Sequence, residues 1–128
     1  MAMDFPNDLR YTDTHEYLRA TSDRLTVGVT AFAVDQLGDI VFVELPAVGR
    51  TVAPGEVVVT IESVKAVGEV YAPVVGTIVA VNEALGDTPE TLADDPYTAG
   101  WLIQMVPAAP PDWSAFLDAE TYRQQVGA

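Results

Sequence analysis

The chain has 128 residues, a net charge of −13 and no cysteine. A chain of this length forms one domain with a modest core, and a hydrophobic content of 49% is typical of a folded globular protein. Nucleic-acid binding requires a basic surface that neutralises phosphates, and 6 basic residues against 19 acidic ones exclude it. The lack of cysteine also excludes thiol catalysis, disulfides and thiolate metal sites.

No run in the sequence approaches the roughly 18 apolar residues of a membrane span, and residues 1–10 contain no apolar signal-peptide core. We therefore expect a soluble protein of the bacterial cytoplasm with no membrane partner. The acidity has two interpretations that the sequence leaves open. Acidic residues keep a protein soluble, and they also steer a carrier toward basic surfaces of larger enzymes.

The N-terminal part of the chain is predicted to form a hairpin after a short lead-in. Alternating and β-branched residues predict its strands, and a Thr-Ser-Asp sequence predicts its turn. In order, these elements are the lead-in 1–10 with Phe5 and Leu9 able to dock, the extended segment 11–18 with Tyr17 and Leu18 partly buried, the turn 21–23 and the strand 25–29.

The next stretch predicts a short helix over residues 31–37. Thr30 suits its N-cap, apolar side chains recur at helical spacing, and Gly38 is the stop signal. A strand is predicted over residues 39–45, where strict alternation gives one wholly apolar face formed by Val41, Val43 and Leu45.

In the rest of the chain, runs of β-branched residues predict strands, and the proline and glycine residues between them predict turns. The expected strands are 57–61, 67–71, 77–79 and 101–106, and the expected short helices are 83–85 and 89–92. After a proline-rich link, Asp112 is predicted to cap a C-terminal helix. Apolar residues at helical spacing support that helix and a further short one beginning at Asp118: Trp113, Phe116 and Leu117 in the first, Tyr122 and Val126 in the second.

Many short strands separated by glycine and proline turns are typical of an antiparallel sandwich or flattened barrel. We therefore predict a mainly β fold with short helices and a C-terminal helix. The whole chain, residues 1–128, is expected to be a single domain. Its core spans about 11–106, and its C-terminal helical segment spans about 112–126.

The sequence offers few residues for catalysis by side chains. His15 is the sole histidine, and there is no nucleophile elbow, phosphate-binding loop or pair of histidines for zinc. The adjacent Asp94 and Asp95 precede Pro96, where a solvated turn is the better interpretation than a catalytic dyad. We therefore expect a protein that is not an enzyme and binds no metal.

Lys65 is the only lysine, because the other five basic residues are arginines. It lies at a predicted turn between two strands. A solvated turn residue is the simplest interpretation of such a lysine. A primary amine can be acylated, however, whereas a guanidinium is not used in this way. Its retention at one position of an otherwise lysine-free chain therefore predicts a modification site.

Several short motifs lie along the chain: Tyr-Thr-Asp-Thr-His-Glu-Tyr at 11–17, Gly-Asp-Ile-Val-Phe-Val-Glu-Leu-Pro at 38–46, Glu-Ser-Val-Lys-Ala at 62–66, Tyr-Ala-Pro at 71–73, Val-Asn-Glu at 81–83, Asp-Pro-Tyr at 95–97 and Gly-Trp at 100–101. From Tyr11 to about Tyr122, these stretches resemble the H-protein family of the glycine cleavage system. The resemblance implies a barrel-sandwich hybrid fold with hammerhead topology, and lipoic acid attached to Lys65 by an amide. The attachment motif then comprises Glu62, Ser63, Val64, Lys65 and Ala66.

The resemblance also implies a carrier that shuttles the aminomethyl group of glycine between enzymes. Its implied partners are the pyridoxal-phosphate-dependent glycine decarboxylase (P protein), the tetrahydrofolate-dependent aminomethyltransferase (T protein), dihydrolipoyl dehydrogenase (L protein), and a lipoyl or octanoyl transferase or lipoate ligase. The loaded arm is expected to fold back on the protein. Its implied polar contacts are Thr14, Glu16 and Glu69, the last standing where an aspartate is usual.

Related carriers fit the sequence less well. A lipoyl domain of a 2-oxoacid dehydrogenase shares the hairpin, but it lacks the Asp-Pro-Tyr and Gly-Trp block and the C-terminal helix. A biotin carrier has methionine on both sides of its lysine, where this chain has Val64 and Ala66. An H-like relay that donates lipoyl groups to other proteins stays open as an alternative, because the sequence does not separate it from glycine cleavage.

Overall fold

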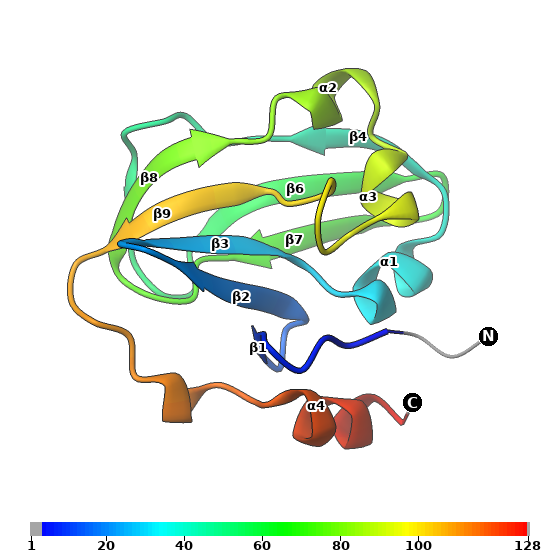
Figure 1. Ribbon diagram of the computed structural model, residues 1–128. Helices are drawn as coiled ribbons and strands as arrows, with labels where there is room; N and C mark the ends of the chain where they lie inside the picture. Colours follow the sequence, from blue (N-terminus) through cyan, green and yellow to red (C-terminus); the bar gives the residue numbers. More distant parts are fainter. Residues whose placement is uncertain (1–3, 128) are drawn as a thin grey trace.

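Two antiparallel sheets pack face to face in the computed structural model, which describes residues 4–127 (Figure 1). The larger sheet has the strand order β1-β2-β3-β9-β8-β5, and the smaller has the order β4-β6-β7. In these described residues the sheets form a sandwich and do not close into a barrel. The strands are β1 (Arg10–Tyr11), β2 (Glu16–Thr21), β3 (Arg24–Val29), β4 (Ile40–Glu44), β5 (Thr51–Val52), β6 (Val57–Ser63), β7 (Val67–Tyr71), β8 (Gly76–Val81) and β9 (Ile103–Pro107).

The main core lies between the two sheets and is built from aliphatic side chains of both. Val27 and Ile78 come from the larger sheet, and Ile61 and Val70 come from the smaller one. All four are buried, as expected for β-branched residues that alternate toward a shared interior. The mainly β fold predicted from the sequence is confirmed.

Three short helices gather at one end of the sandwich: α1 (Ala31–Leu37), α2 (Ala84–Asp87) and α3 (Thr91–Asp94) (Figure 1). A 3₁₀ turn η1 (Trp113–Ala115) follows β9, and α4 (Ala119–Val126) lies alongside β1. Both predicted ends of α1 are confirmed. The Ala33 N–H donates to the Thr30 hydroxyl at 3.3 Å, and the Gly38 N–H donates to the Val34 carbonyl at 3.0 Å. Among the described residues, no helix is long and apolar enough to cross a membrane.

The predicted apolar face of the strand at residues 39–45 is wrong in part. The pairing of β4 with β6 shifts register between Ile40 and Phe42, so one extra residue is inserted in β4. Such a bulge breaks the alternation of side chains. Val43 is therefore buried, whereas Val41 and Phe42 both face solvent.

The helix expected from Asp112 is also shorter than predicted. Asp112 accepts from the Ser114 N–H at 3.0 Å, but this cap opens only the single turn η1. The chain then extends, because Leu117 exchanges two backbone hydrogen bonds of 2.8 Å with Tyr11. The second predicted helix is confirmed as α4, whose N-cap Asp118 accepts from the Thr121 N–H at 2.8 Å.

A second cluster of aromatic residues joins the N-terminal lead-in to α4. The Tyr11 and Tyr122 rings stack with centroids 4.8 Å apart, and the Phe5 ring meets Tyr122 edge-on at 5.2 Å. Leu9 is buried in the same cluster, so the docking expected of the lead-in is confirmed. Tyr17 is completely buried, more deeply than the sequence suggested. These contacts tie both ends of the described chain to the strands between them.

Candidate functional site

Lys65 lies on the tight turn that joins β6 to β7. The Ser63 N–H donates to the Ala66 carbonyl at 2.8 Å, and the Ser63 hydroxyl both donates to that carbonyl and accepts from the Ala66 N–H. Ser63 therefore closes the turn through backbone and side chain together. The hydrogen bonds fix the backbone on either side of Lys65 and leave its side chain free to project.

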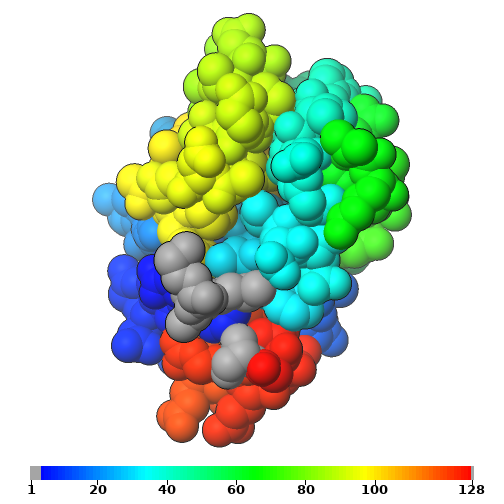
Figure 2. Space-filling view, turned by 90° about the vertical axis from the view of Figure 1, so that its right-hand side faces the viewer, coloured from blue at the N-terminus to red at the C-terminus, as the bar shows by residue number. Residues whose placement is uncertain are grey.

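The turn is also attached to the end of α1. The Val64 N–H donates to the Asp39 carbonyl at 3.0 Å, and the Lys65 side chain passes over Gly38. A Cβ at Gly38 would lie 3.2 Å from the Lys65 Cε, and the positive φ of 81° independently favours glycine there. Figures 1 and 2 show the end of the β6–β7 hairpin beside α1 and the start of β4.

Lys65 is exposed to solvent. Within residues 4–127 the structure has one ion pair, between Arg50 and Glu56 at 3.5 Å, so no carboxylate of this region holds the lysine. Glu62 and Val64 are exposed next to it, and Ala66 is half-buried. The turn thus presents an amine that an acylating enzyme can approach.

A groove of about 290 Å³ runs between α1, β7 and the segment that precedes β2. Its walls are mostly apolar, and Thr14 and Glu69 both line it. Leu37, another wall residue, directly precedes the Gly38 that touches Lys65. The groove therefore begins close to the turn. Its remaining lining residues are His15, Val29, Phe32, Ala33, Gln36, Ile61, Gly68 and Val70.

Glu16, the third implied contact of the arm, lies elsewhere. Its side chain is only 1% exposed and lines a separate hollow of about 390 Å³, which Thr14 also borders. The Thr12 and Thr14 hydroxyls donate to its Oε1 at 2.5 and 2.6 Å, and the Tyr71 N–H donates to Oε2 at 3.3 Å. Burial raises the pKa of Glu16, and these hydrogen bonds act in the opposite direction. The structure thus brings Thr14 and Glu69 together at the groove and connects Glu16 to it through Thr14.

A hydrogen-bond network at the groove wall could not be derived from the sequence. His15 Nδ1 and the Tyr122 hydroxyl share a hydrogen bond of 2.7 Å, and the same hydroxyl lies 2.7 Å from the Thr30 hydroxyl. Burial lowers the pKa of His15 and raises that of Tyr122 to about 12, so both are neutral at pH 7. The network connects α4 to the groove wall across 107 positions of the chain. The only sign of this network in the sequence was that His15 is the sole histidine.

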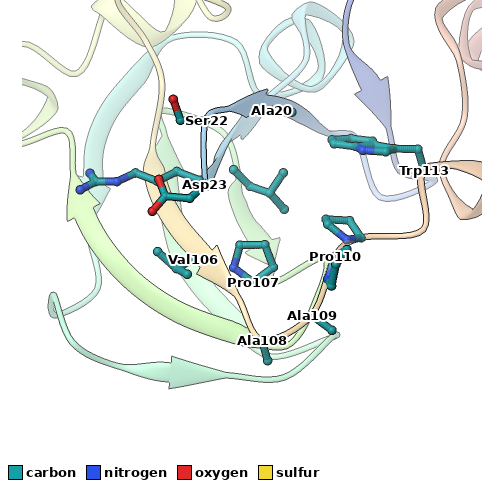
Figure 3. A pocket seen from close by; sticks show the side chains of 12 residues that line it. Ala20, Ser22, Asp23, Val106, Pro107, Ala108, Ala109, Pro110 and Trp113 are labelled. Carbon is teal, nitrogen blue, oxygen red and sulfur yellow. The ribbon is translucent and has the colours of Figure 1, made fainter.

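A further hollow lies away from the turn. It holds about 440 Å³ and lies around the proline-rich segment that follows β9 (Figure 3). In Figure 3, Pro107, Pro110 and Trp113 line much of it, and Ser22 and Asp23 stand at its edge. It contains none of the residues predicted for the site. Residues 4–127 also hold no cluster of three or more potential metal ligands.

Comparisons with known proteins agree with this geometry. The family described as Glycine cleavage H-protein matches residues 9–128. The chain is 54% identical over 126 residues to the glycine cleavage system H protein of Synechococcus sp. (strain RCC307), covering 98% of this chain and 97% of that protein. It is 55% identical over 126 residues to that of Thermosynechococcus vestitus, covering 98% of each.

The crystal structure of a glycine cleavage system H protein from Mycobacterium marinum has the same fold. It superposes with a TM-score of 0.87 at 45% identity, covering 97% of this chain and 100% of that one. The resemblance inferred from the sequence motifs is confirmed over nearly the whole chain. This protein belongs to the glycine cleavage H-protein family.

Proposed function

We propose that this protein is the lipoyl carrier of the glycine cleavage system, with lipoic acid attached to the Nζ of Lys65 through an amide. The observation that carries the proposal is the position of the only lysine. It is exposed on a turn closed by Ser63, its side chain lies over Gly38, and a groove begins beside it. Membership of the family supports the carrier role.

The residues of the groove fit such a group. A lipoyl arm is largely aliphatic, and the groove offers apolar walls that include Phe32, Leu37 and Ile61. Thr14 and Glu69 add a hydroxyl and a carboxylate to the lining. A carboxylate would stabilise an amine carried at the end of the arm, because charge-assisted hydrogen bonds are the stronger ones.

An attached lipoyl group would supply the chemistry that the side chains lack: a disulfide that could take up the aminomethyl group of glycine at the P protein as carbon dioxide leaves, give its carbon to tetrahydrofolate and its nitrogen as ammonia at the T protein, and be reoxidised from the dithiol by the L protein. The chain's own residues then hold and present the arm. Ser63 and Asp39 fix the backbone of the turn, and the groove walls exclude water from part of the arm. The bacterial source of the relatives supports a cytoplasmic setting for this exchange.

The acidity of the chain fits a carrier that visits several enzymes in turn. Complementary charges raise association rates without requiring a tight complex, which suits a protein that must also leave. With a net charge of −13, the partners are expected to present basic docking surfaces. Their association rates should then decrease as salt is added.

Intact-mass measurement tests the attachment. After expression with lipoate, the parent should carry one lipoyl or octanoyl adduct, and Lys65→Arg should carry none. Arginine keeps the charge at the turn, so the variant removes only the acylatable amine. An adduct that survives the substitution, or a second adduct on the parent, would contradict the assignment.

A further inference from the structure

The outer surface of the three-stranded sheet and its hairpin turn carry most of the large hydrophobic residues that are exposed in the described chain. Cross-strand pairing places Phe42, Glu62 and Val67 in one row that points away from the core. The next row contains Glu44, Thr60 and Glu69. We refer to these six residues, together with Val41 and Val64, as the hairpin face.

Four of the six large hydrophobic residues that are exposed in the described chain lie on the hairpin face. Phe42 is 46% exposed and Val67 is 64% exposed, on either side of Glu62. The bulge in β4 turns both Val41 and Phe42 outward, and Val64 is exposed on the turn itself. Single exposed apolar residues need no explanation, but a group of four beside a modification site indicates an interaction surface.

The charges of this surface are of one sign apart from Lys65. Glu44, Glu62 and Glu69 supply carboxylates, and Lys65 is the only base within β4, β6, β7 and the β6–β7 turn. The arginines lie on other elements: Arg10 in β1, Arg19 in β2, Arg24 in β3, Arg50 before β5 and Arg123 in α4. A partner complementary to this surface would offer an apolar pocket with basic side chains at its rim.

The position of the hairpin face, next to the Lys65 turn, indicates which kind of enzyme would bind it. An enzyme that acylates Lys65 must bring its acyl donor within bonding distance of Nζ, so it must cover the turn. Glu62 and Val67 are the last pair of the hairpin before that turn, and Phe42 lies beside Glu62. An enzyme that acts on the far end of an attached arm has no such constraint.

From this geometry we infer that the hairpin face is the docking surface for the enzyme that acylates Lys65, with Phe42 and Val67 as its apolar anchors. The inference rests on the proposed function in one respect, that Lys65 is the residue acylated. Large side chains seated in pockets at the centre of an interface carry most of the binding energy, and aromatic ones are prominent among them. The carboxylate of Glu62 lies between the anchors and contacts the basic rim.

With a lipoate ligase as the enzyme, the reaction is an acyl transfer. The unprotonated Nζ attacks the carbonyl carbon of the acyl-adenylate that the ligase makes from lipoate and ATP. The amide C–N bond forms, the C–O bond to AMP breaks, and AMP and one proton leave. The hairpin face takes no part in these bond changes, so its residues act by positioning the amine.

The experiment measures kcat/KM for acylation of purified unmodified protein by a lipoate ligase, read as the mass increase of the intact chain. Phe42→Ala should lower kcat/KM about tenfold or more, mainly through KM, as expected for loss of an interface anchor. Val67→Thr keeps the β-branched shape and adds a hydroxyl, and it should lower kcat/KM about threefold. This variant retains the fold even if Phe42→Ala is destabilised.

Two exposed valines outside the hairpin face serve as matched controls. Val48 is 59% exposed and Val75 is 48% exposed, so Val48→Thr and Val75→Thr make the same chemical change elsewhere. Both should be acylated at the parent rate. The defects of Phe42→Ala and Val67→Thr should persist at high salt, because apolar contacts are not screened as ionic ones are.

The outcomes separate this inference from the proposed function. If the parent is not acylated at Lys65, the proposed function fails. If the parent is acylated and all four variants match it, the hairpin face is not the docking surface and the inference is overturned. Concentration-dependent sedimentation of the parent, abolished by Phe42→Ala with no change in acylation, would assign the face to a second copy of this chain and overturn the inference equally.

Discussion

Replacing Glu16 with alanine should lower the stability of the fold, because this buried carboxylate accepts hydrogen bonds from three donors. Two are the hydroxyls of Thr12 and Thr14, and the third is the backbone N–H of Tyr71 in β7. The carboxylate thus connects the segment before β2 to the smaller sheet. The alanine variant removes all three acceptor contacts at once.

The expected loss follows from the surroundings of each donor. Thr14 is exposed and Thr12 is half-buried, so water can replace the carboxylate at both hydroxyls with little net cost. The half-buried Tyr71 N–H loses its side-chain acceptor, and an unsatisfied buried donor costs about 1–3 kcal/mol. We expect a total of about 2 kcal/mol, which corresponds to a decrease in Tm of roughly 5 to 10 °C for a domain of this size.

The matched variant Glu16→Gln tests the charge separately. Burial raises the pKa of Glu16 above its ordinary value of 4.5, so the folded state binds this proton more tightly than the unfolded chain does. The stability that Glu16 contributes is therefore complete below the ordinary pKa and is lost as the pH rises through the raised one. Glutamine does not titrate. The stability of the parent relative to Glu16→Gln should thus decrease over that window.

Thermal unfolding gives the Tm of each variant, and urea denaturation at pH values on both sides of this window gives the free energy of unfolding; tryptophan fluorescence follows both transitions. A Tm for Glu16→Ala within about 2 °C of the parent's would refute the reasoning. Such a decrease is smaller than the one expected from the loss of a single hydrogen bond of this kind. A difference between parent and Glu16→Gln that does not change with pH would show that the carboxylate is not destabilised by burial.

The other predictions concern the groove and the turn. Glu69→Gln keeps the size of the side chain and removes its charge from the groove, so it should shorten the lifetime of aminomethyl-loaded protein, measured as formaldehyde release without partner enzymes. Glu16→Ala should shorten it too, by releasing Thr14, and equal rates in both variants and the parent would mean that these residues do not hold the arm. Glu62→Gln should leave the fold intact and slow attachment, most strongly at low salt; equal attachment rates at low salt would remove Glu62 from recognition.

The parts of the fold that the sequence predicted well are those set by local chemistry. The α1 helix has a side-chain cap at Thr30 and a glycine stop at Gly38, and both signals lie within a few residues of the backbone that they satisfy. The β6–β7 hairpin follows from two β-branched runs around a short turn. Lys65 could be singled out because its identity and its turn are both local properties.

The differences arise where a distant segment decides the conformation. Asp112 is a good N-cap, yet its helix ends after one turn, because Leu117 pairs with Tyr11 more than a hundred residues earlier. The bulge in β4 depends on pairing with β6, and a period-two pattern does not contain it. The buried Glu16 likewise accepts from the Tyr71 N–H of a strand far along the chain. Composition marks none of these contacts.

The C-terminal end of α1 gives the candidate site its arrangement, because consecutive residues there serve the groove and the turn. Leu37 lines the groove and packs where a Cβ on Gly68 would lie 3.1 Å away, so the absence of that Cβ lets α1 approach β7. Gly38 then turns the chain with a positive φ under the Lys65 side chain, and the Asp39 carbonyl receives the Val64 N–H. A rotation of α1 would therefore move the groove wall and the attachment turn together. Under the proposed function, an arm attached at Lys65 would therefore keep the same entrance to its groove in both positions of the helix.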